Sequence, residues 1–378
     1  MPETTRLKGM TWNHSRGFDP MRATSDAYTQ AHPHVTIEWD KRSLQAFADQ
    51  PIETMTQEYD LIVIDHPHVG DIARNGLLLS FDGIGRDDEL ATLAEQSVGV
   101  SHASYQFDGH QWALAIDAAT PVAAFRPDKL PQPPTRWNEV LELARRGHVA
   151  FALIPINALM TFFGMAKNKN YPLAEGEQLL ARDAATDILE TMREVTACLN
   201  PKCLELDPIG IYEWMSQDPD SPIYSPFGYG YTNYSRNNYR TFLLHFADAP
   251  GFDNNGPCGS VIGGTGIAIS AACLHKDIAV DYAFHIASGE CQKSLFFESG
   301  GQPANACAWE DDACNAATQN FFRNTRNTLE TAWLRPRYNG YMDFQDKGGD
   351  IVHACLRGDI NVTSAIDRLQ IAYEESIS

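Results

Sequence analysis

A short apolar stretch in the first quarter of the sequence ends at residues that could bind a polar ligand. Residues 61–64 are four consecutive aliphatics, and the sequence Asp-His-Pro-His follows at 65–68. A carboxylate accepts hydrogen bonds, and an imidazole donates or accepts them, so these groups suit a hydroxyl-rich molecule or a metal ion. The same residues could instead cap the next helix or lie in a solvated loop, and this stretch alone leaves both interpretations open.

The apolar run is too short for an amphipathic helix and lacks the alternation of a strand with one exposed face. We therefore predict a strand covered on both faces, as in the parallel sheet of an α/β fold. In such sheets ligands bind beyond the carboxyl ends of the strands, which is where Asp65 and His66 fall. His68 is separated from His66 by Pro67 and is expected to lie outside the site.

The sequence around this strand alternates between strand and helix patterns. Strands are predicted at residues 7–11, 35–39 and 61–64, and helices at residues 18–31, around 44–47 and after 68. This βαβαβ order predicts a parallel sheet with helices on its faces.

A predicted hairpin closes this first region. Residues 105–116 form two aromatic-bearing segments joined by Asp108 and Gly109, which a tight turn prefers. After a proline-rich passage at 127–134, apolar residues recur at helical spacing from Trp137 to Ala144. We interpret this helix as the beginning of a second domain.

The rest of the second half is predicted mainly from spacing and glycine positions. Residues 150–250 are mostly helical in pattern, interrupted by an aromatic and glycine-rich run at 224–239. Residues 259–270 predict a glycine-rich turn that leads into a strand. Two helices should follow, one with Ile278, Tyr282 and Ile286 on one face, and one at residues 291–297.

Composition limits the partners and the compartment. The 378 residues suffice for two domains, and the formal charge of -20 argues against a nucleic acid or an anionic membrane as partner. No apolar run is long enough to span a membrane. The sequence start lacks the features of a signal peptide, so either a leader has been removed or the protein is cytoplasmic.

Eight cysteines leave the redox environment open. Cys198 with Cys203, and Cys307 with Cys314, are close enough in sequence to pair locally, but all four could equally be thiols. No CxxC pair occurs, which disfavours structural zinc.

Taken in order, these segments resemble the family 1 extracellular solute-binding proteins, the ligand receptors of bacterial ABC importers for sugars and related solutes. The resemblance rests on DLIVID (60–65) with GLLLSFD after it, YQFDGHQWALAIDAAT (105–120), GGTGIAIS (263–270) and IAVDYAFHIASGECQKSLFFESGGQP (278–303). It implies an α/β, periplasmic-binding-protein-like fold of two lobes, each a mainly parallel sheet flanked by helices, with a ligand cleft that closes by hinging. Residues 1–117 with 263–305 would form lobe 1, and 118–262 with 306–378 would form lobe 2.

Within that fold, polar residues after strands or at lobe boundaries are the expected ligand contacts, because carboxylates and amides bind hydroxyl groups well. These candidates are Trp12, Asn13, His14, Asp65, His66, Asp117 and Thr120. The glycine-rich turn adds Gly264 and Thr265, whose small side chains would let backbone amides approach a ligand. Glu298 and Gln302 flank a later glycine pair. Helix caps and turns are the alternative roles.

Lobe 2 is expected to contribute aromatic faces and one cation. Trp214, Tyr229 and Tyr231 could cover the apolar face of a sugar, with core packing as the alternative. Arg337, in WLRPRYNGY, would favour an organic acid or a sugar acid if it lay in the cleft, because its fork matches a carboxylate. It could instead hold a structural acid.

No catalytic residue, cofactor or metal is expected. GGTGIAIS fails the GxGxxG spacing and has no Walker lysine, and GxSxG and HExxH are absent. Thiamine-cleaving enzymes of this architecture carry a cysteine nucleophile after the hairpin, where this sequence has Ala-Ala-Thr at 118–120. Cys258 is the one cysteine worth watching, although it has no identified base partner. A metal on His14, Asp65, His66 and His68 is chemically possible, because imidazole and carboxylate ligands suit zinc, iron or manganese, but it is the less favoured alternative.

We therefore expect a monomeric receptor that captures a sugar, polyol or sugar acid and delivers it to ABC permease subunits. It would be periplasmic or extracellular if a leader has been removed. The alternative is a cytoplasmic enzyme or sensor of the same fold that acts on a small organic acid.

Overall fold

The computed structural model describes residues 4–42, 52–252 and 260–377, so the helix expected around 44–47 and Cys258 lie outside the described residues. The chain divides into two compact units. The first unit comprises Met1–Ala118, Gly263–Asn315 and Arg337–Asn339, and the second comprises Ala119–Ile262, Ala316–Pro336 and Gly340–Ser378. The expected lobes differ from these units by assigning 118, 306–315 and 337–339 to the second lobe.

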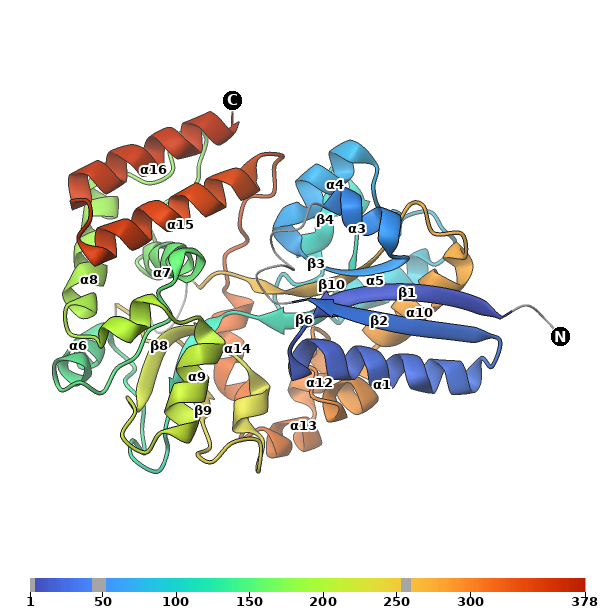
Figure 1. Ribbon diagram of the computed structural model, residues 1–378, viewed down its shortest axis with the longest axis horizontal. Coiled ribbons are helices and arrows are strands. Elements are labelled where there is room, and N and C mark those ends of the chain that lie inside the picture. Colours follow the sequence, from blue (N-terminus) through green and yellow to red (C-terminus); the bar gives the residue numbers. More distant parts are fainter. Residues whose placement is uncertain (1–3, 43–51, 253–259, 378) are drawn as a thin grey trace. The chain divides into compact units, whose positions relative to one another are not determined.

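A five-stranded sheet forms the centre of the first unit (Figure 1). Its order is β2-β1-β3-β10-β6, and its strands are β1 (Thr5–Trp12), β2 (Val35–Arg42), β3 (Leu61–Asp65), β6 (Leu114–Ala119) and β10 (Gly263–Ile269). β1 is parallel to both β2 and β3, which confirms the parallel arrangement predicted from the βαβαβ order. β10 comes from a distant part of the sequence and runs antiparallel to β3, with Thr265 opposite Asp65.

Helices and short turns surround this sheet. They are α1 (Ser15–Ala31), α3 (Ile52–Glu58), η1 (His66–His68), α4 (Val69–Asn75), α5 (Asp87–Glu95), η2 (Ala103–Tyr105), α10 (Lys276–Ala287), α11 (Gly289–Cys291), the π-helix η5 (Gln292–Phe296), α12 (Ala306–Glu310) and α13 (Asp312–Ala317). The helices predicted at 18–31, around Ile278–Ile286 and at 291–297 are confirmed, the last as α11 continued by η5.

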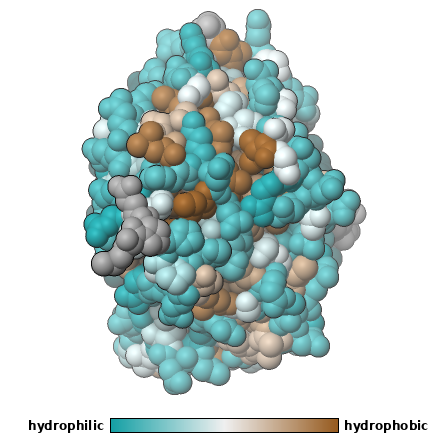
Figure 2. Space-filling model, turned by 90° about the vertical axis from the view of Figure 1, so that its right-hand side faces the viewer, coloured by the Kyte–Doolittle hydropathy of each residue, from teal (hydrophilic) through white to brown (hydrophobic). Residues whose placement is uncertain are grey.

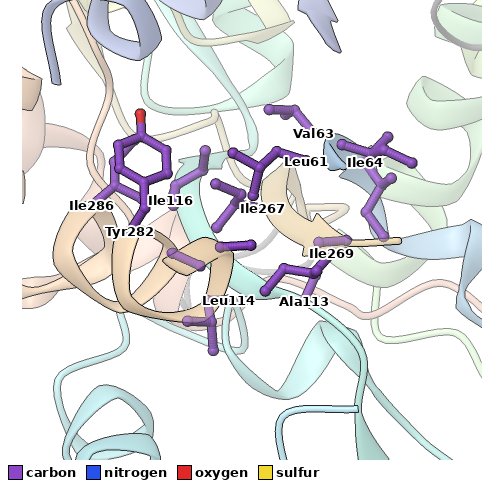
Figure 3. Close-up of a cluster of buried hydrophobic side chains, with 14 of the residues drawn as sticks. Leu61, Val63, Ile64, Ala113, Leu114, Ile116, Ile267, Ile269, Tyr282 and Ile286 are labelled. Carbon is purple, nitrogen blue, oxygen red and sulfur yellow. The ribbon is translucent and has the colours of Figure 1, made fainter. Parts of the chain in front are cut away.

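Side chains from β3, β6, β10 and α10 meet in the core of the first unit (Figure 3). Val63, Ile116, Ile267 and Ile286 are at most 1% exposed. Burial of one such side chain contributes roughly 1.5–3 kcal/mol. β3 is covered on both faces, as its uninterrupted aliphatic sequence predicts, because Leu61–Ile64 are all buried.

The predicted hairpin is confirmed but short. β4 (Gln106–Phe107) pairs antiparallel with β5 (His110–Gln111). Asp108 and Gly109 have φ angles of 52° and 78°, the left-handed conformation that a two-residue hairpin turn requires.

The second unit contains a three-stranded sheet of order β8-β7-β9, with strands β7 (Pro121–Phe125), β8 (Tyr224–Tyr229) and β9 (His245–Ala247). β7 is antiparallel to both neighbours, so the prediction of a mainly parallel sheet is wrong for this unit. The aromatic run at 224–239 includes β8 and does not form a loop alone. Its strand was hidden because Pro226 and Gly228 are both residues that strands usually avoid.

Helices make up most of the second unit. They are α6 (Trp137–Arg145), α7 (Pro155–Asn168), α8 (Arg182–Thr196), η3 (Pro201–Leu204), α9 (Pro208–Gln217), η4 (Thr232–Ser235), α14 (Phe321–Glu330), α15 (Tyr341–Arg357) and α16 (Val362–Ile377). α6 matches the helix predicted from Trp137. α15 packs closely on α7 at Gly349. A Cβ atom at this position would lie 2.9 Å from the backbone of Pro155, the first residue of α7.

The face of the molecule in Figure 2 is mainly hydrophilic. On the face in Figure 2, hydrophobic residues form small separate patches. Among the described residues, the large hydrophobic side chains that are exposed are Leu274, Ile371 and Ile377. No helix in the described ranges has the length and apolar character needed to cross a membrane.

Candidate functional site

One edge of the first sheet gathers most of the predicted polar residues. β1 and β3 are parallel and end at this edge, and β10 begins there because it runs antiparallel to β3. We call this the first-unit edge, and it contains Trp12, Asn13, His14, Asp65, His66, Asp117, Gly264 and Thr265. The strand order brings these residues together at the level of the backbone, while their contact with a ligand stays a prediction.

The residues after β1 have different local roles. The Trp12 ring is 5% exposed and packs on Gly17, where a Cβ atom would lie 2.3 Å from the indole. His14 is the N-cap of α1, and its Nδ1 accepts a hydrogen bond of 3.0 Å from the backbone N–H of Arg16. Asn13 is exposed, and its backbone N–H donates to the carbonyl of Arg42. The capping alternative therefore describes His14, and Asn13 presents its amide at the surface.

Asp117 forms a buried ion pair with Arg16, a residue that sequence reasoning missed. The Nε–H of Arg16 donates to Oδ2 of Asp117 at 2.7 Å, and Nη2 donates to Oδ1. Both side chains are at most 4% exposed. Burial raises the pKa of the Asp117 carboxyl, and the Arg16 guanidinium opposes this by favouring the ionised form. The contact joins the first turn of α1 to β6.

Asp65 ends β3 and His66 follows it, and the two side chains lie in different environments. Asp65 is partly exposed, and its side chain makes no capping hydrogen bond to η1. His66 is fully buried, with its ring edge-on to Tyr105 at a centroid distance of 6.4 Å. The Tyr105 hydroxyl lies 3.2 Å from the carbonyl oxygen of Ile64 and 3.3 Å from that of Gly264, so it holds β3 and β10 together. Asp65 is thus the partly exposed carboxylate of the first-unit edge.

Position 264 needs a glycine because the backbone of the neighbouring strand β6 approaches it closely. Its φ is +98°, and a Cβ atom there would lie 2.2 Å from the carbonyl oxygen of Asp117. A protein backbone therefore occupies the space that we expected a ligand to need. Thr265 is 6% exposed, and its hydroxyl has no hydrogen-bond partner among the described residues.

The remaining candidates of this unit hold backbone segments or lie at the surface. Gln302 is 1% exposed, and its Nε2 donates to the carbonyl of Ala118 at 2.7 Å. Glu298 is exposed. Arg337 belongs to the first unit, where its Nη1 donates to the carbonyls of residues 103, 104 and 106 at 3.0, 2.9 and 2.6 Å. Desolvation lowers the pKa of Arg337. The observed partners of Arg337 Nη1 are therefore backbone carbonyls, whereas we expected a ligand or a structural acid.

A second group of candidates lies where β7 begins. Thr120 donates from Oγ1 to the carbonyl of Val261 at 3.3 Å, and Pro121 pairs with Tyr229 at the end of β8. Val261 in turn bridges to Trp333. We call this the second-unit edge, defined by Thr120, Tyr229, Val261 and Trp333. Trp333 is partly exposed. It begins the segment WLRPRYNGY, but the sequence did not predict it as a site residue.

The other two aromatic candidates have protein partners. Tyr231 is 7% exposed and packs edge-on against Tyr212, so core packing describes it well. Trp214 lies on α9, where its Nε1 donates to Asp218 at 3.3 Å and Lys202 Nζ lies 4.7 Å from the ring centroid. The ammonium therefore occupies one face of the indole that was expected to cover a sugar.

The described residues include no group of three or more His, Cys, Asp or Glu side chains arranged to hold a metal ion. Cys198 and Cys203 are both thiols, and so are Cys307 and Cys314. Cys314 donates from Sγ to the carbonyl of Lys293.

The sequence matches no protein-family model and no curated protein. The structure is similar to solved structures of ABC transporter solute-binding proteins. One, from Agrobacterium radiobacter K84 in complex with ribitol, has a TM-score of 0.82 and 19% identity, over 99% of both chains. Maltose-bound MalE3 of T. maritima has a TM-score of 0.84 and 13% identity, over 98% of this chain and 100% of that one. A protein from Thermotoga lettingae TMO bound with α-D-tagatose has a TM-score of 0.80 and 13% identity, over 99% of this chain and 100% of that one. The predicted two-lobe, periplasmic-binding-protein-like fold is therefore confirmed.

Proposed function

We propose that this protein is the solute-binding receptor of an ABC importer and that it captures a small polar solute. The observation that carries the proposal is similarity of fold over nearly the full length to proteins solved with ribitol, maltose and tagatose. A match that spans 98% or more of this chain leaves no room for an additional domain of another function within it.

The polar groups of the two edges support a hydroxyl-rich solute. The first-unit edge offers the exposed amide of Asn13 and the partly exposed carboxylate of Asp65. The second-unit edge offers the aromatic rings of Tyr229 and Trp333, both partly exposed. Carboxylates and amides bind hydroxyl groups, and aromatic faces cover the apolar faces of sugars. Both kinds of contact replace the water that a polyol loses on binding.

Recognition in this proposal needs no covalent step. A solute that binds one conformation of the receptor more tightly shifts the population towards that conformation, by as much as its affinity differs between conformations. The loaded receptor then delivers the solute to the permease subunits in the cytoplasmic membrane, from the outer side of that membrane. We propose that it acts as a monomer.

Equilibrium dialysis against sugars, polyols and sugar acids, followed by mass spectrometry of the recovered solute, tests this function. We expect at least one compound to bind with a Kd of about micromolar order and to be recovered unchanged. Asp65→Asn should weaken binding by about tenfold, which corresponds to one lost charge-assisted hydrogen bond. Glu290→Gln changes an exposed carboxylate of the same unit and should leave binding unchanged.

Conversion of the bound compound into a product would contradict the receptor proposal and would indicate an enzyme on this fold. Equal binding by the wild-type and Asp65→Asn proteins would remove Asp65 from the site without affecting the receptor proposal.

A further inference from the structure

Arg335 is a buried cation that has no acidic partner among the described residues. The residue is 8% exposed and lies in the second unit, between α14 and α15. Its Nη1 donates to Oε1 of Gln345 at 2.6 Å, and its buried Nε has no hydrogen-bond partner in the part of the chain that the structure describes. Within the described ranges, Gln345 is its one side-chain partner and no carboxylate forms an ion pair with it. The guanidinium is therefore held in place by a neutral amide.

Two other buried arginines of this protein, Arg16 and Arg126, form ion pairs with aspartates. Arg16 donates from Nε and Nη2 to Asp117, and Arg126 donates from Nε and Nη2 to Asp128. The chain has 49 acidic residues and 29 Lys and Arg residues, so acids are in excess. An unpaired buried guanidinium opposes folding, because burial removes the charge from water without compensation. Arg335 thus carries a cost that a local acid could have removed.

The contact with Gln345 engages Nη1 and leaves the other edge of the guanidinium, formed by Nε and Nη2. Among the described residues, Nε on that edge has no hydrogen-bond partner. The two N–H groups on that edge are parallel and match the two oxygens of a carboxylate. Gln345 is itself 6% exposed and lies near the beginning of α15, so it fixes the plane of the guanidinium from a long helix.

Arg335 also lies close in sequence to the second-unit edge. Trp333, two residues earlier, donates from its backbone N–H to the carbonyl of Ser260 at 2.6 Å and accepts from the N–H of Ile262 at 2.9 Å. These bonds fix the extended segment that contains Trp333 and Arg335 beside Val261. The carbonyl of Val261 accepts the hydrogen bond from the Thr120 hydroxyl.

We propose that Arg335 binds the carboxylate of the transported solute, so that the preferred solutes are sugar acids rather than neutral sugars or polyols. This inference rests on the proposed receptor function. It assigns to Arg335 the discrimination that the sequence suggested for Arg337, whose Nη1 is engaged by three backbone carbonyls. Gln345 is the positioning residue.

Titration calorimetry with matched acid and neutral compounds tests the inference. The pairs are D-glucuronate with D-glucose, D-galacturonate with D-galactose, and D-gluconate with D-sorbitol. We expect the acid of at least one pair to bind 100-fold or more tightly than its neutral partner. Arg335→Met should abolish this preference, and Arg335→Lys should keep only part of it, because an ammonium lacks the planar fork.

Arg126→Met is the matched control, since it removes a buried arginine of the same unit that has its own acid. It should leave the preference for acids unchanged. A second readout is the unfolding midpoint without ligand, which Arg335→Met should raise and Arg126→Met should lower. A lowered midpoint for Arg335→Met with an unchanged acid preference would assign Arg335 a structural role and overturn the inference.

Tighter binding of the neutral members would also overturn the inference, while leaving the receptor function intact. Binding of none of the six compounds would contradict the inference, while the receptor function is decided separately by the wider dialysis panel described above.

Discussion

Arg16 and Asp117 lie 101 positions apart in sequence, and their ion pair fixes the beginning of α1 to β6. Both groups are buried, so each depends on the other to compensate its lost hydration. The residue types alone suggested a ligand-binding carboxylate at 117, because an acid after a strand has the same sequence signature in either role. Only the long-range contact distinguishes them, and such a contact is not encoded locally.

Asp117→Asn should destabilise the protein strongly, because it leaves the Arg16 guanidinium buried without a counter-charge. We expect a loss of about 3–5 kcal/mol in the free energy of unfolding, measured with urea. The double variant Arg16→Met with Asp117→Leu removes both charges and should recover most of that loss. A loss below about 1 kcal/mol for Asp117→Asn would show that the ion pair is not the main link between α1 and β6.

His102 makes stability depend on pH. Burial lowers its pKa to about 4, and the nearby charge of Asp82 opposes this shift only partly. The unfolded chain has a histidine pKa near 6.5, so between pH 6.5 and 4 the unfolded state binds a proton that the folded state does not. Stability from this group is therefore complete above pH 6.5 and falls as the pH decreases towards 4, by up to about 3 kcal/mol.

Urea unfolding at pH 7.0, 5.5 and 4.5 checks this effect. His102→Gln should show a smaller loss over that interval than the wild-type protein. Identical pH dependence in the two proteins would exclude His102 as the origin.

At the scale of elements, β10 determines how the first-unit edge is built. It is inserted between β3 and β6 from nearly 200 residues further along the chain, and its first residues lie against the ends of both neighbours. The glycine-rich sequence of 263–266 is explained by these close approaches. Gly266 contacts Tyr105 and Gly264 contacts the backbone of Asp117. Glycine pattern alone could not distinguish packing against a strand from approach to a ligand.

Gly264→Ala should therefore cost more than the strain of a left-handed residue. Position 264 combines a φ of +98° with a Cβ clash against backbone, whereas Gly83 has a φ of +67° and nothing within 4 Å. We expect Gly83→Ala to cost about 1 kcal/mol and Gly264→Ala at least about 2 kcal/mol more, measured by chemical unfolding. Equal costs would mean that the β10–β6 contact relaxes without penalty.

The elements that could be predicted are those with strong local signals. β3 follows from four aliphatic residues, the hairpin from Asp108-Gly109, and α6 from its apolar spacing and the glycine after it. The antiparallel sheet of the second unit could not be predicted, since β7 pairs with strands about 100 and 120 residues away. Pairing over such separations depends on the packing of intervening helices.

At the scale of the whole molecule, the order of elements was more informative than any single motif. The predicted sequence of strands, hairpin and closing helix pair matched a fold that the solved structures confirm at 13–19% identity. The candidate site was less predictable, because side chains after strands serve as caps, ion-pair partners and ligand contacts with equal ease. His14 caps a helix and Asp117 is an ion-pair partner. Arg337 has a further role, since it binds backbone carbonyls.

Thermal unfolding of the whole protein across a panel of sugars, polyols and sugar acids tests the receptor function most directly. A ligand that binds only the folded state adds about 2.7 kcal/mol at one hundred times its Kd. We predict that one chemical class raises the unfolding midpoint in proportion to the logarithm of its concentration, with sugar acids having the largest effect. An unchanged midpoint with every compound at millimolar concentration would contradict the account.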